Sequence, residues 1–233
     1  MPELKNKYKY QLLFVNGENA AHGRGITQKI YKEFMDLGVN AITTGNHVFC
    51  NHDVFNFIDN SNLIRPLNYP DCHGKGFLKI NFNGKTITII NLLGRVYMNL
   101  VIDCPFQAID KFLENDKSDY YFVDFHSEAT SEKIAMGYFL DGRVDALVGT
   151  HTHVQTNDER ILPNDTCYIT DVGMTGPLNG VIGVEKEIIV SRFLKGFSTE
   201  SFKVAQGRRQ LNGIFLDLSD KKRPKIEKIK IYE

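Results

Sequence analysis

Seven polar side chains with metal-binding chemistry follow four short apolar stretches of the chain. They are Glu18, Asn19, Asn46, His47, His126, His151 and His153. Carboxylate, amide oxygen and imidazole together form a hard-to-intermediate ligand set that suits Mn, Fe, Zn or Mg, whereas a soft-metal site would recruit cysteines. The residue types therefore predict a site for first-row divalent or trivalent metal ions.

The pair His151 and His153 is the most specific part of this set. A single histidine or asparagine at the end of a strand is more often a hydrogen-bonded loop residue than a ligand. Two histidines separated by one residue on extended chain point the same way, so they can chelate one ion or bridge two. For this pair the two interpretations are about equally favoured. The repetition of the pattern at four strand ends favours a site.

The size of the set points to hydrolysis of phosphate esters. One acidic group, Glu18, can bridge, and at least three imidazoles complete enough ligands for two ions about 3.5 to 4 Å apart. Such a pair binds phosphate oxygens and lowers the pKa of a bridging water, so hydroxide can attack at neutral pH. If the chain is extended at Asn46, the side chain of His47 points away from that neighbour. His47 then suits a general acid for the leaving alkoxide, with a hydrogen-bonded loop histidine as the alternative.

The elements that must position these side chains alternate between strands and helices. Residues 27–37 repeat apolar side chains at helical spacing and are followed by Gly38, while Asn83-Gly84 suits a type I′ hairpin. We expect strands at 10–15, 39–43, 77–82, 85–92, 120–125, 145–149 and 166–170, helices at 27–37, 55–59, 106–113, 131–140 and 185–194, and a hairpin over 213–232. This order predicts a layered α/β domain with a mixed sheet. Ligands bind at the carboxyl ends of strands in such sheets, so the polar side chains should converge.

The composition fits one globular domain over residues 1–233. With 42% hydrophobic and 24% charged residues, the chain is not of the disordered class. The 28 basic and 28 acidic side chains cancel, so no global field gathers a polyanion and no specific nucleic-acid partner is expected. No apolar stretch approaches the roughly 20 residues of a membrane helix, and no secretory signal is recognised. We expect a cytoplasmic protein, and the sequence is compatible with a homo-oligomer.

Three other features have ordinary explanations. Cys50, Cys72, Cys104 and Cys167 form no C-x-x-C pair, which favours free thiols over disulfides or a zinc knuckle. The basic run at 221–225 is predicted to be a solvated hairpin turn. Residues 171–177 fit a glycine loop lining a phosphate pocket and a tight strand-to-helix turn equally well.

Five ordered segments resemble the YmdB-like bacterial metallophosphoesterases of the calcineurin-like superfamily. They are Asn16–Gly23, Thr44–His47, Asp124–Glu132, Gly149–Thr156 and Thr170–Pro177. The resemblance runs from about Pro2 to the C-terminus. It implies a four-layer αββα fold with mixed sheets and a dinuclear centre of iron or manganese. It also implies phosphodiesterase activity on a small phosphodiester or nucleotide substrate, including 2′,3′-cyclic nucleotides and cyclic AMP.

The resemblance also implies a role for each residue of the set. Glu18 bridges both metals, Asn19 and His153 bind the first, Asn46, His126 and His151 bind the second, and His47 donates the proton. The residue types alone do not assign each side chain to one of the two ions, and they do not give the class of substrate. Both come from the resemblance.

One part of the family pattern has no counterpart in this sequence. Family members begin with a strand ending in Gly-Asp, whose aspartate binds the first metal, and a helix then leads into the counterpart of residues 4–8. We therefore expect an N-terminally truncated fold whose first metal lacks an anionic ligand, with weaker binding and lower turnover. Loss of an inner strand should also leave unpaired backbone groups and apolar surface. A misplaced start, a decayed copy or a strand supplied by a partner would each explain the missing segment.

Two other functions are weighed against the phosphodiesterase. The first is a catalytically impaired fragment or non-catalytic remnant of the family with an incomplete first metal site. The second is a metallo-β-lactamase type of hydrolase, which needs His-x-His-x-Asp-His. This sequence has Gln155 and Thr156 where that motif has Asp-His, so the second is discounted.

Overall fold

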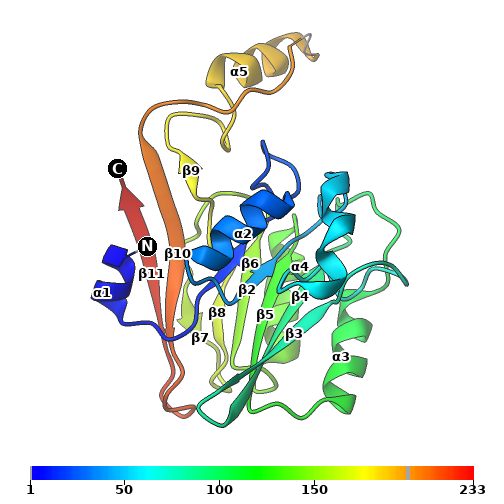
Figure 1. The fold of residues 1–233 in the computed structure, drawn as a ribbon, viewed down its shortest axis with the longest axis vertical. Coiled ribbons are helices and arrows are strands. Elements are labelled where there is room, and N and C mark those ends of the chain that lie inside the picture. Colours follow the sequence, from blue (N-terminus) through cyan, green and yellow to red (C-terminus); the bar gives the residue numbers. More distant parts are fainter. Residues whose placement is uncertain (1, 198–199) are drawn as a thin grey trace.

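The computed structural model describes residues 2–197 and 200–233. Its centre is a six-stranded mixed sheet with the strand order β3-β4-β5-β6-β8-β7 (Figure 1). The four inner strands run parallel, and the edge strands β3 and β7 run antiparallel to their neighbours. The strands are β3 (Phe77–Phe82), β4 (Lys85–Leu93), β5 (Tyr120–His126), β6 (Ala146–Thr150), β7 (Arg160–Ile161) and β8 (Cys167–Ile169).

Two smaller sheets accompany the central one. In the first, β1 (Phe14–Asn16) pairs in parallel with β2 (Ala41–Thr43). In the second, β10 (Arg209–Asp217) and β11 (Lys225–Tyr232) form an antiparallel hairpin to which β9 (Gly176–Pro177) adds a short third strand. The basic run at 221–225 spans the turn of this hairpin and the first residue of β11, which confirms that prediction.

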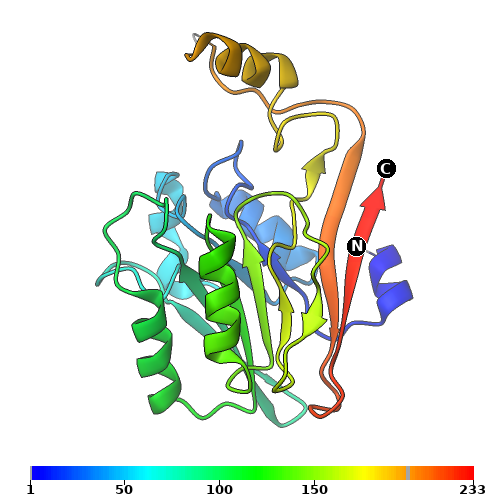
Figure 2. The same cartoon turned by 180° about the vertical axis from the view of Figure 1, so that it is seen from behind.

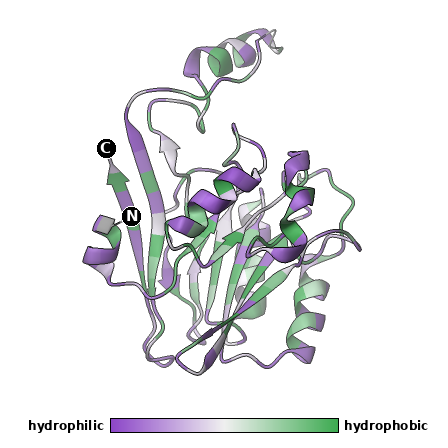
Figure 3. Cartoon of the chain, viewed as in Figure 1, coloured by the Kyte–Doolittle hydropathy of each residue, from purple (hydrophilic) through white to green (hydrophobic). Residues whose placement is uncertain are grey.

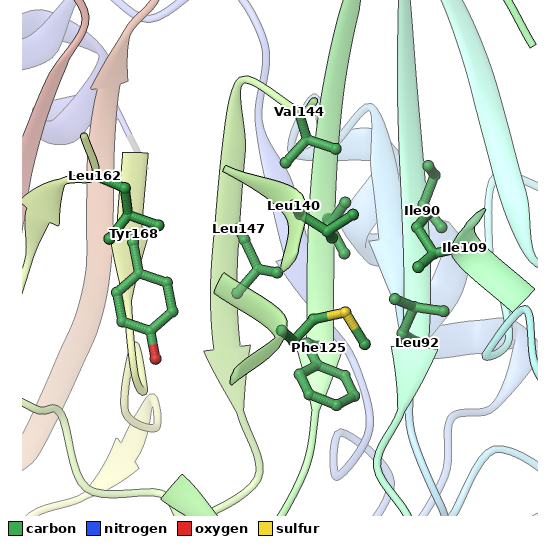
Figure 4. Close-up of a cluster of buried hydrophobic side chains, with 11 residues drawn as sticks. Ile90, Leu92, Ile109, Phe125, Leu140, Val144, Leu147, Leu162 and Tyr168 are labelled. Atoms are coloured by element: carbon green, nitrogen blue, oxygen red, sulfur yellow. The ribbon is translucent and has the colours of Figure 1, made fainter. Parts of the chain in front are cut away.

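Three clusters of hydrophobic side chains fill the interfaces between layers. The first packs α3 (Pro105–Asn115) and α4 (Thr130–Leu140) on the six-stranded sheet (Figure 4). The second packs α2 (Gln28–Asp36) on the β1–β2 sheet, and the third lies between the two sheets. Figure 2 shows α3 and α4 on the side opposite to α2. Helix, sheet, sheet and helix follow one another, as the four-layer α/β prediction requires.

Alternation along the strands divides the apolar residues among these interfaces. Ile89 belongs to the cluster between the sheets, whereas its neighbour Ile90 faces the helices. Phe14 likewise faces the second sheet, and Val15 faces α2. Successive side chains of a strand point to opposite faces, and each fully buried aliphatic side chain stabilises the fold by about 1.5–3 kcal/mol. Strand segments between two layers are therefore apolar on both faces, and they read as short continuous apolar runs such as Phe14-Val15 and Ile89-Ile90.

Local signals place several predicted elements correctly. The hydroxyl of Thr27 accepts from the backbone N–H of Ile30 and caps α2, and Gly38 follows the helix with φ of +81°. Asn83 and Gly84 have φ of +49° and +73°, as a type I′ turn between β3 and β4 requires. The helices predicted at 106–113, 131–140 and 185–194 are present as α3, α4 and α5 (Lys186–Lys195).

Other boundaries differ from the prediction. The strand expected at 10–15 is the shorter β1, and the helix expected at 55–59 is two 3₁₀ turns, η1 (His52–Asn56) and η2 (Ile58–Asn60). The short helix α1 (Pro2–Tyr8) and the two-residue strands β7 and β9 were not predicted. Elements this short carry too few residues to show a hydrophobic period.

Helix α5 projects away from the sheets in both views (Figures 1 and 2). Phe193 and Leu194 on this helix are each 82% exposed. Figure 3 shows hydrophilic colour over most of α1 and α2 and hydrophobic colour along the strands of the central sheet. None of the helices in residues 2–197 and 200–233 is long and apolar enough to cross a membrane.

One edge of β1 faces a large groove. Within the described residues, β1 pairs with β2 alone. The groove has a volume of about 2070 Å³, and Phe14 and Val15 line it together with Ile214 and Leu216 of β10. An unpaired strand edge therefore lies beside an apolar wall of the groove.

Replacement of Gly149 in β6 should destabilise the fold. A Cβ there would lie 1.7 Å from the carbonyl oxygen of Thr170, so the backbone must move. We expect Gly149→Ala to lower the free energy of unfolding by about 1–3 kcal/mol or more, measured by urea denaturation. Gly213→Ala in β10 is the matched control, because a Cβ there meets nothing within 4 Å. Equal stability of the two variants would contradict this packing.

Candidate metal centre

The seven predicted side chains meet where the two sheets face each other. Glu18 and Asn19 follow β1, Asn46 and His47 follow β2, His126 ends β5, and His151 and His153 follow β6. Six of them line the groove, namely Glu18, Asn19, His47, His126, His151 and His153. The ends of four parallel strands thus bring together residues that are up to 135 positions apart, as the sequence predicted.

Three of these side chains form one half of the centre. His126 Nε2 lies 3.0 Å from Asn46 Oδ1 and 3.0 Å from His151 Nδ1. The other nitrogen of each ring is already engaged, because His126 Nδ1 lies 2.9 Å from the Thr150 hydroxyl and His151 Nε2 lies 3.0 Å from the Glu128 carboxylate. Protons on those outer nitrogens leave lone pairs on the inner ones. Three acceptor atoms then face one another, an arrangement that a cation stabilises.

The other half contains Asn19 and His153, whose Nδ2 and Nε2 atoms are 3.0 Å apart. His153 Nδ1 lies 3.1 Å from the carbonyl oxygen of Ile182, which accepts its proton. The His-x-His segment is not extended, because His151 and His153 have φ of +107° and +65°. The two imidazoles therefore lie in different halves of the centre. The expectation that they point the same way from an extended chain is wrong, but their placement fits the alternative in which the pair bridges two ions.

Glu18 stands between the halves and is 1% exposed. Its Oε1 accepts the backbone N–H of His47 at 2.5 Å and lies 3.7 Å from His126 Nε2. Its Oε2 is buried and has no hydrogen-bond partner among the described residues. Burial raises the pKa of Glu18 to about 8, against the opposing effect of backbone hydrogen bonds from His47 and Gly45.

The donor set fits metal ions. Among the residues described, no three His, Cys, Asp or Glu side chains meet as a ready-made metal site, so asparagine oxygens must complete any ligand set. A buried carboxylate oxygen without a partner is costly unless a cation pairs with it. Burial lowers the pKa of His126 and of His151, and this favours the neutral imidazole that a metal ligand must be.

His47 does not point away from its neighbour. The chain turns at residues 46–49 instead of continuing as a strand, and Asn46 Nδ2 lies 3.3 Å from His47 Nε2. His47 Nδ1 lies 3.4 Å from the Cys50 thiol. Burial is the main cause that lowers the pKa of His47, and the charges of Arg24 and the neighbouring histidines lower it further. All four cysteines are free thiols, as predicted.

Sequence reasoning missed the residues that orient the centre. Thr150 Oγ1 donates to Asp124 Oδ1 at 2.7 Å and lies 2.9 Å from His126 Nδ1. The hydroxyl of Thr150 therefore links the buried carboxylate to the imidazole through two hydrogen bonds. Glu128 contacts His151 from outside. A signal for Asp124 was present, because residues two apart on a strand share a face and Asp124 precedes His126 by two.

The sequence profile of a family described as YmdB-like protein matches residues 1–231. A 2′,3′-cyclic-nucleotide 2′-phosphodiesterase of Bacillus subtilis is 48% identical over 237 residues, which cover 99% of this chain and 89% of that protein.

Two solved structures resemble the fold closely. A protein from Thermus thermophilus superimposes with a TM-score of 0.93 and 39% identity, covering 100% of this chain and 91% of the other. A phosphatase from Mycoplasma pneumoniae has a TM-score of 0.92 and 40% identity over 99% of this chain and 85% of the other.

The buried Glu18 should make the stability of the metal-free protein pH-dependent. Its pKa is about 8 in the folded state against 4.5 for the ordinary group, so unfolding releases its proton between these values and stability falls as pH rises. We expect Glu18→Gln to match the wild type near pH 5 and to exceed it near pH 9. Urea unfolding in EDTA at both pH values measures this. Parallel pH profiles for the two proteins would contradict it.

Proposed function

The chain belongs to the YmdB-like family and is a phosphoesterase, and from that premise we propose a dinuclear metal-dependent phosphodiesterase. Its substrates are cyclic nucleotides of the 2′,3′-cyclic or cyclic AMP type. The observation that carries the proposal is the convergence of the seven predicted side chains around the buried, unpartnered Oε2 of Glu18. Hydrolysis of a phosphodiester needs charge stabilisation, an activated water and a proton for the leaving oxygen.

Each residue of the centre has a place in this proposal. The residues that would hold the ions are Glu18 between them, Asn19 and His153 on the first, and Asn46, His126 and His151 on the second. When bound, a pair of iron or manganese ions supplies Lewis-acid activation of the phosphate and of the attacking water. Thr150 and Glu128 hold the imidazoles of the second group in the tautomers that direct a lone pair inward.

His47 is proposed to protonate the leaving alkoxide. It lines the groove, and its backbone N–H, donated to Glu18 Oε1, fixes its main chain beside the centre. Burial favours the neutral imidazole in the free protein. The negative charge of a bound phosphodiester acts in the opposite direction and favours the protonated form when substrate is present.

The substrate class rests on the relatives and on the charge of the groove. The formal net charge of the chain is zero, so attraction for a phosphodiester must be local. Arg24 lines the groove and lies close enough to His47 to influence its pKa. The identity of 48% to the Bacillus subtilis enzyme supports a cyclic nucleotide as the ligand of this groove.

An impaired enzyme with an incomplete first metal site is the second candidate. The observation that favours it is the composition of the first group. Among the described residues, Glu18 is the one carboxylate that this group shares with Asn19 and His153. Elemental analysis after dialysis against Mn²⁺ separates the candidates. Two equivalents per chain support the complete centre, and one or none supports the impaired one.

Activity should depend on added metal and on His151. We expect hydrolysis of bis-p-nitrophenyl phosphate and of 2′,3′-cyclic AMP with added Mn²⁺, and its loss in EDTA. The control is His151→Ala, which removes one of three acceptors around the second ion and should lower kcat/KM by at least about 100-fold. Wild-type activity no higher than that of His151→Ala would refute the phosphodiesterase.

Replacement of His47 should affect the two substrates unequally. A general acid matters most when the leaving group is a poor one, and it contributes roughly 10²- to 10⁴-fold. We expect His47→Gln to lower kcat for 2′,3′-cyclic AMP, which releases an alkoxide, by at least about 100-fold. The loss for bis-p-nitrophenyl phosphate, which releases a stable phenolate, should be much smaller. Equal losses for both substrates would exclude proton donation by His47.

A further inference from the structure

A buried ion pair lies next to the candidate centre without belonging to it. Lys133 Nζ of α4 lies 2.7 Å from Asp171 Oδ2, and the side chains are 0% and 1% exposed. Removing two charges from water is unfavourable, so such a pair adds little stability compared with apolar side chains of the same volume. Its hydrogen bonds to the rest of the chain are therefore the place to look for its role.

The carboxylate of Asp171 accepts hydrogen bonds from the middle of the His-x-His segment. Its Oδ2 accepts the N–H of Thr152 at 3.0 Å and the hydroxyl of Thr152 at 2.8 Å. Its Oδ1 accepts the N–H of Gly173 at 2.9 Å. Thr152 is the residue between the two histidines, so the ion pair holds the segment at its midpoint.

That segment needs support because its backbone is strained. His151 has φ of +107° and His153 has φ of +65°, and residues other than glycine rarely adopt such positive φ values. Strained backbone persists where the surrounding structure over-determines it. These φ values are also what turns one imidazole toward His126 and the other toward Asn19.

The chain leaves room for the ion pair. Lys133 reaches Asp171 past Gly149, where an added Cβ would lie 3.0 Å from the Cδ of Lys133. Lys133 donates to the same Oδ2 that accepts both groups of Thr152, so one oxygen joins the cation to the segment. Charge on the acceptor makes such hydrogen bonds roughly twice as strong as neutral ones.

We propose that Asp171, with Lys133 as its counterion, is a positioning residue for the metal centre. The pair holds residues 151–153 in the strained conformation that presents one imidazole to each half of the centre. This inference rests on the proposed function for the identity of the ligand. It concerns the shape of the segment, which exists with or without metal.

Asp171→Asn tests the proposal, because it keeps the size of the side chain and removes its charge and one acceptor. We expect Mn²⁺ affinity, measured by equilibrium dialysis with metal analysis, to fall about 10- to 100-fold. In the metal-free variant, the ring resonances of His151 and His153 should shift in ¹H–¹⁵N spectra, with assignments from single histidine substitutions. Wild-type affinity together with unmoved resonances would overturn the proposal.

Asp145→Asn is the matched control. Asp145 is also a nearly buried partner of a lysine, with Lys221 Nζ at 2.6 Å, and it also accepts a backbone N–H, from Tyr121. Asp145 lies at the other end of β6 from the centre. The substitution Asp145→Asn should therefore lower stability without changing Mn²⁺ affinity, measured at a temperature where all variants are folded. Equal loss of affinity in both variants would reduce the effect to general destabilisation and contradict positioning.

Thr152→Val provides a second test that leaves the ion pair intact. It removes the hydroxyl bond to Asp171 and retains the backbone bond, so we expect a fall in affinity of about 2- to 10-fold, the worth of one hydrogen bond. Unchanged affinity here would contradict the proposal even if Asp171→Asn does not fold. Absence of Mn²⁺ binding in the wild type would refute the proposed function instead, and the metal-free histidine spectra would then decide the positioning role alone.

Discussion

The carboxylate of Asp124 joins the two sheets, and the rest of the centre depends on that junction. Asn16 of β1 donates to its Oδ2 at 2.9 Å, Thr43 of β2 donates at 2.5 Å, and Thr150 of β6 donates to Oδ1 at 2.7 Å. A buried carboxylate is tolerated when its lone pairs are satisfied in this way. Because Thr150 also contacts His126, one side chain sets both the relation of the sheets and the direction of an imidazole.

The centre is divided between the sheets that Asp124 connects. The β1–β2 sheet supplies the carboxylate, the two amides and His47, and the six-stranded sheet supplies the other three histidines. Under the proposed assignment, neither sheet alone supplies all the residues that would hold either ion. The hydrophobic cluster between the sheets therefore matters for the centre as well as for stability, since it lies in the interface across which these side chains meet.

Local features of the fold and the convergence of the seven side chains could be predicted from the sequence. An apolar run that ends in polar residues marks the end of a strand, and Asn83-Gly84 marks a hairpin, without knowledge of the rest of the chain. The conformation of the ligands could not be predicted in this way. The turn at His47 depends on Glu18, 29 positions earlier, and the φ values of the His-x-His segment depend on Asp171. Long-range hydrogen bonds of this kind leave no periodic signal.

The same long-range hydrogen bonds have a consequence for the order of folding. Asn16 and Asp124 are 108 positions apart, and Asn19 and His153 are 134 apart. Hairpins such as β3–β4 close short loops and form early, whereas contacts between distant residues form slowly because closing a long loop loses more entropy. We therefore expect the centre to be among the last parts to assemble. A chain that has formed its local structure but has not docked its sheets lacks the assembled centre, so under the proposed function we expect hydrolysis to begin only when folding is complete.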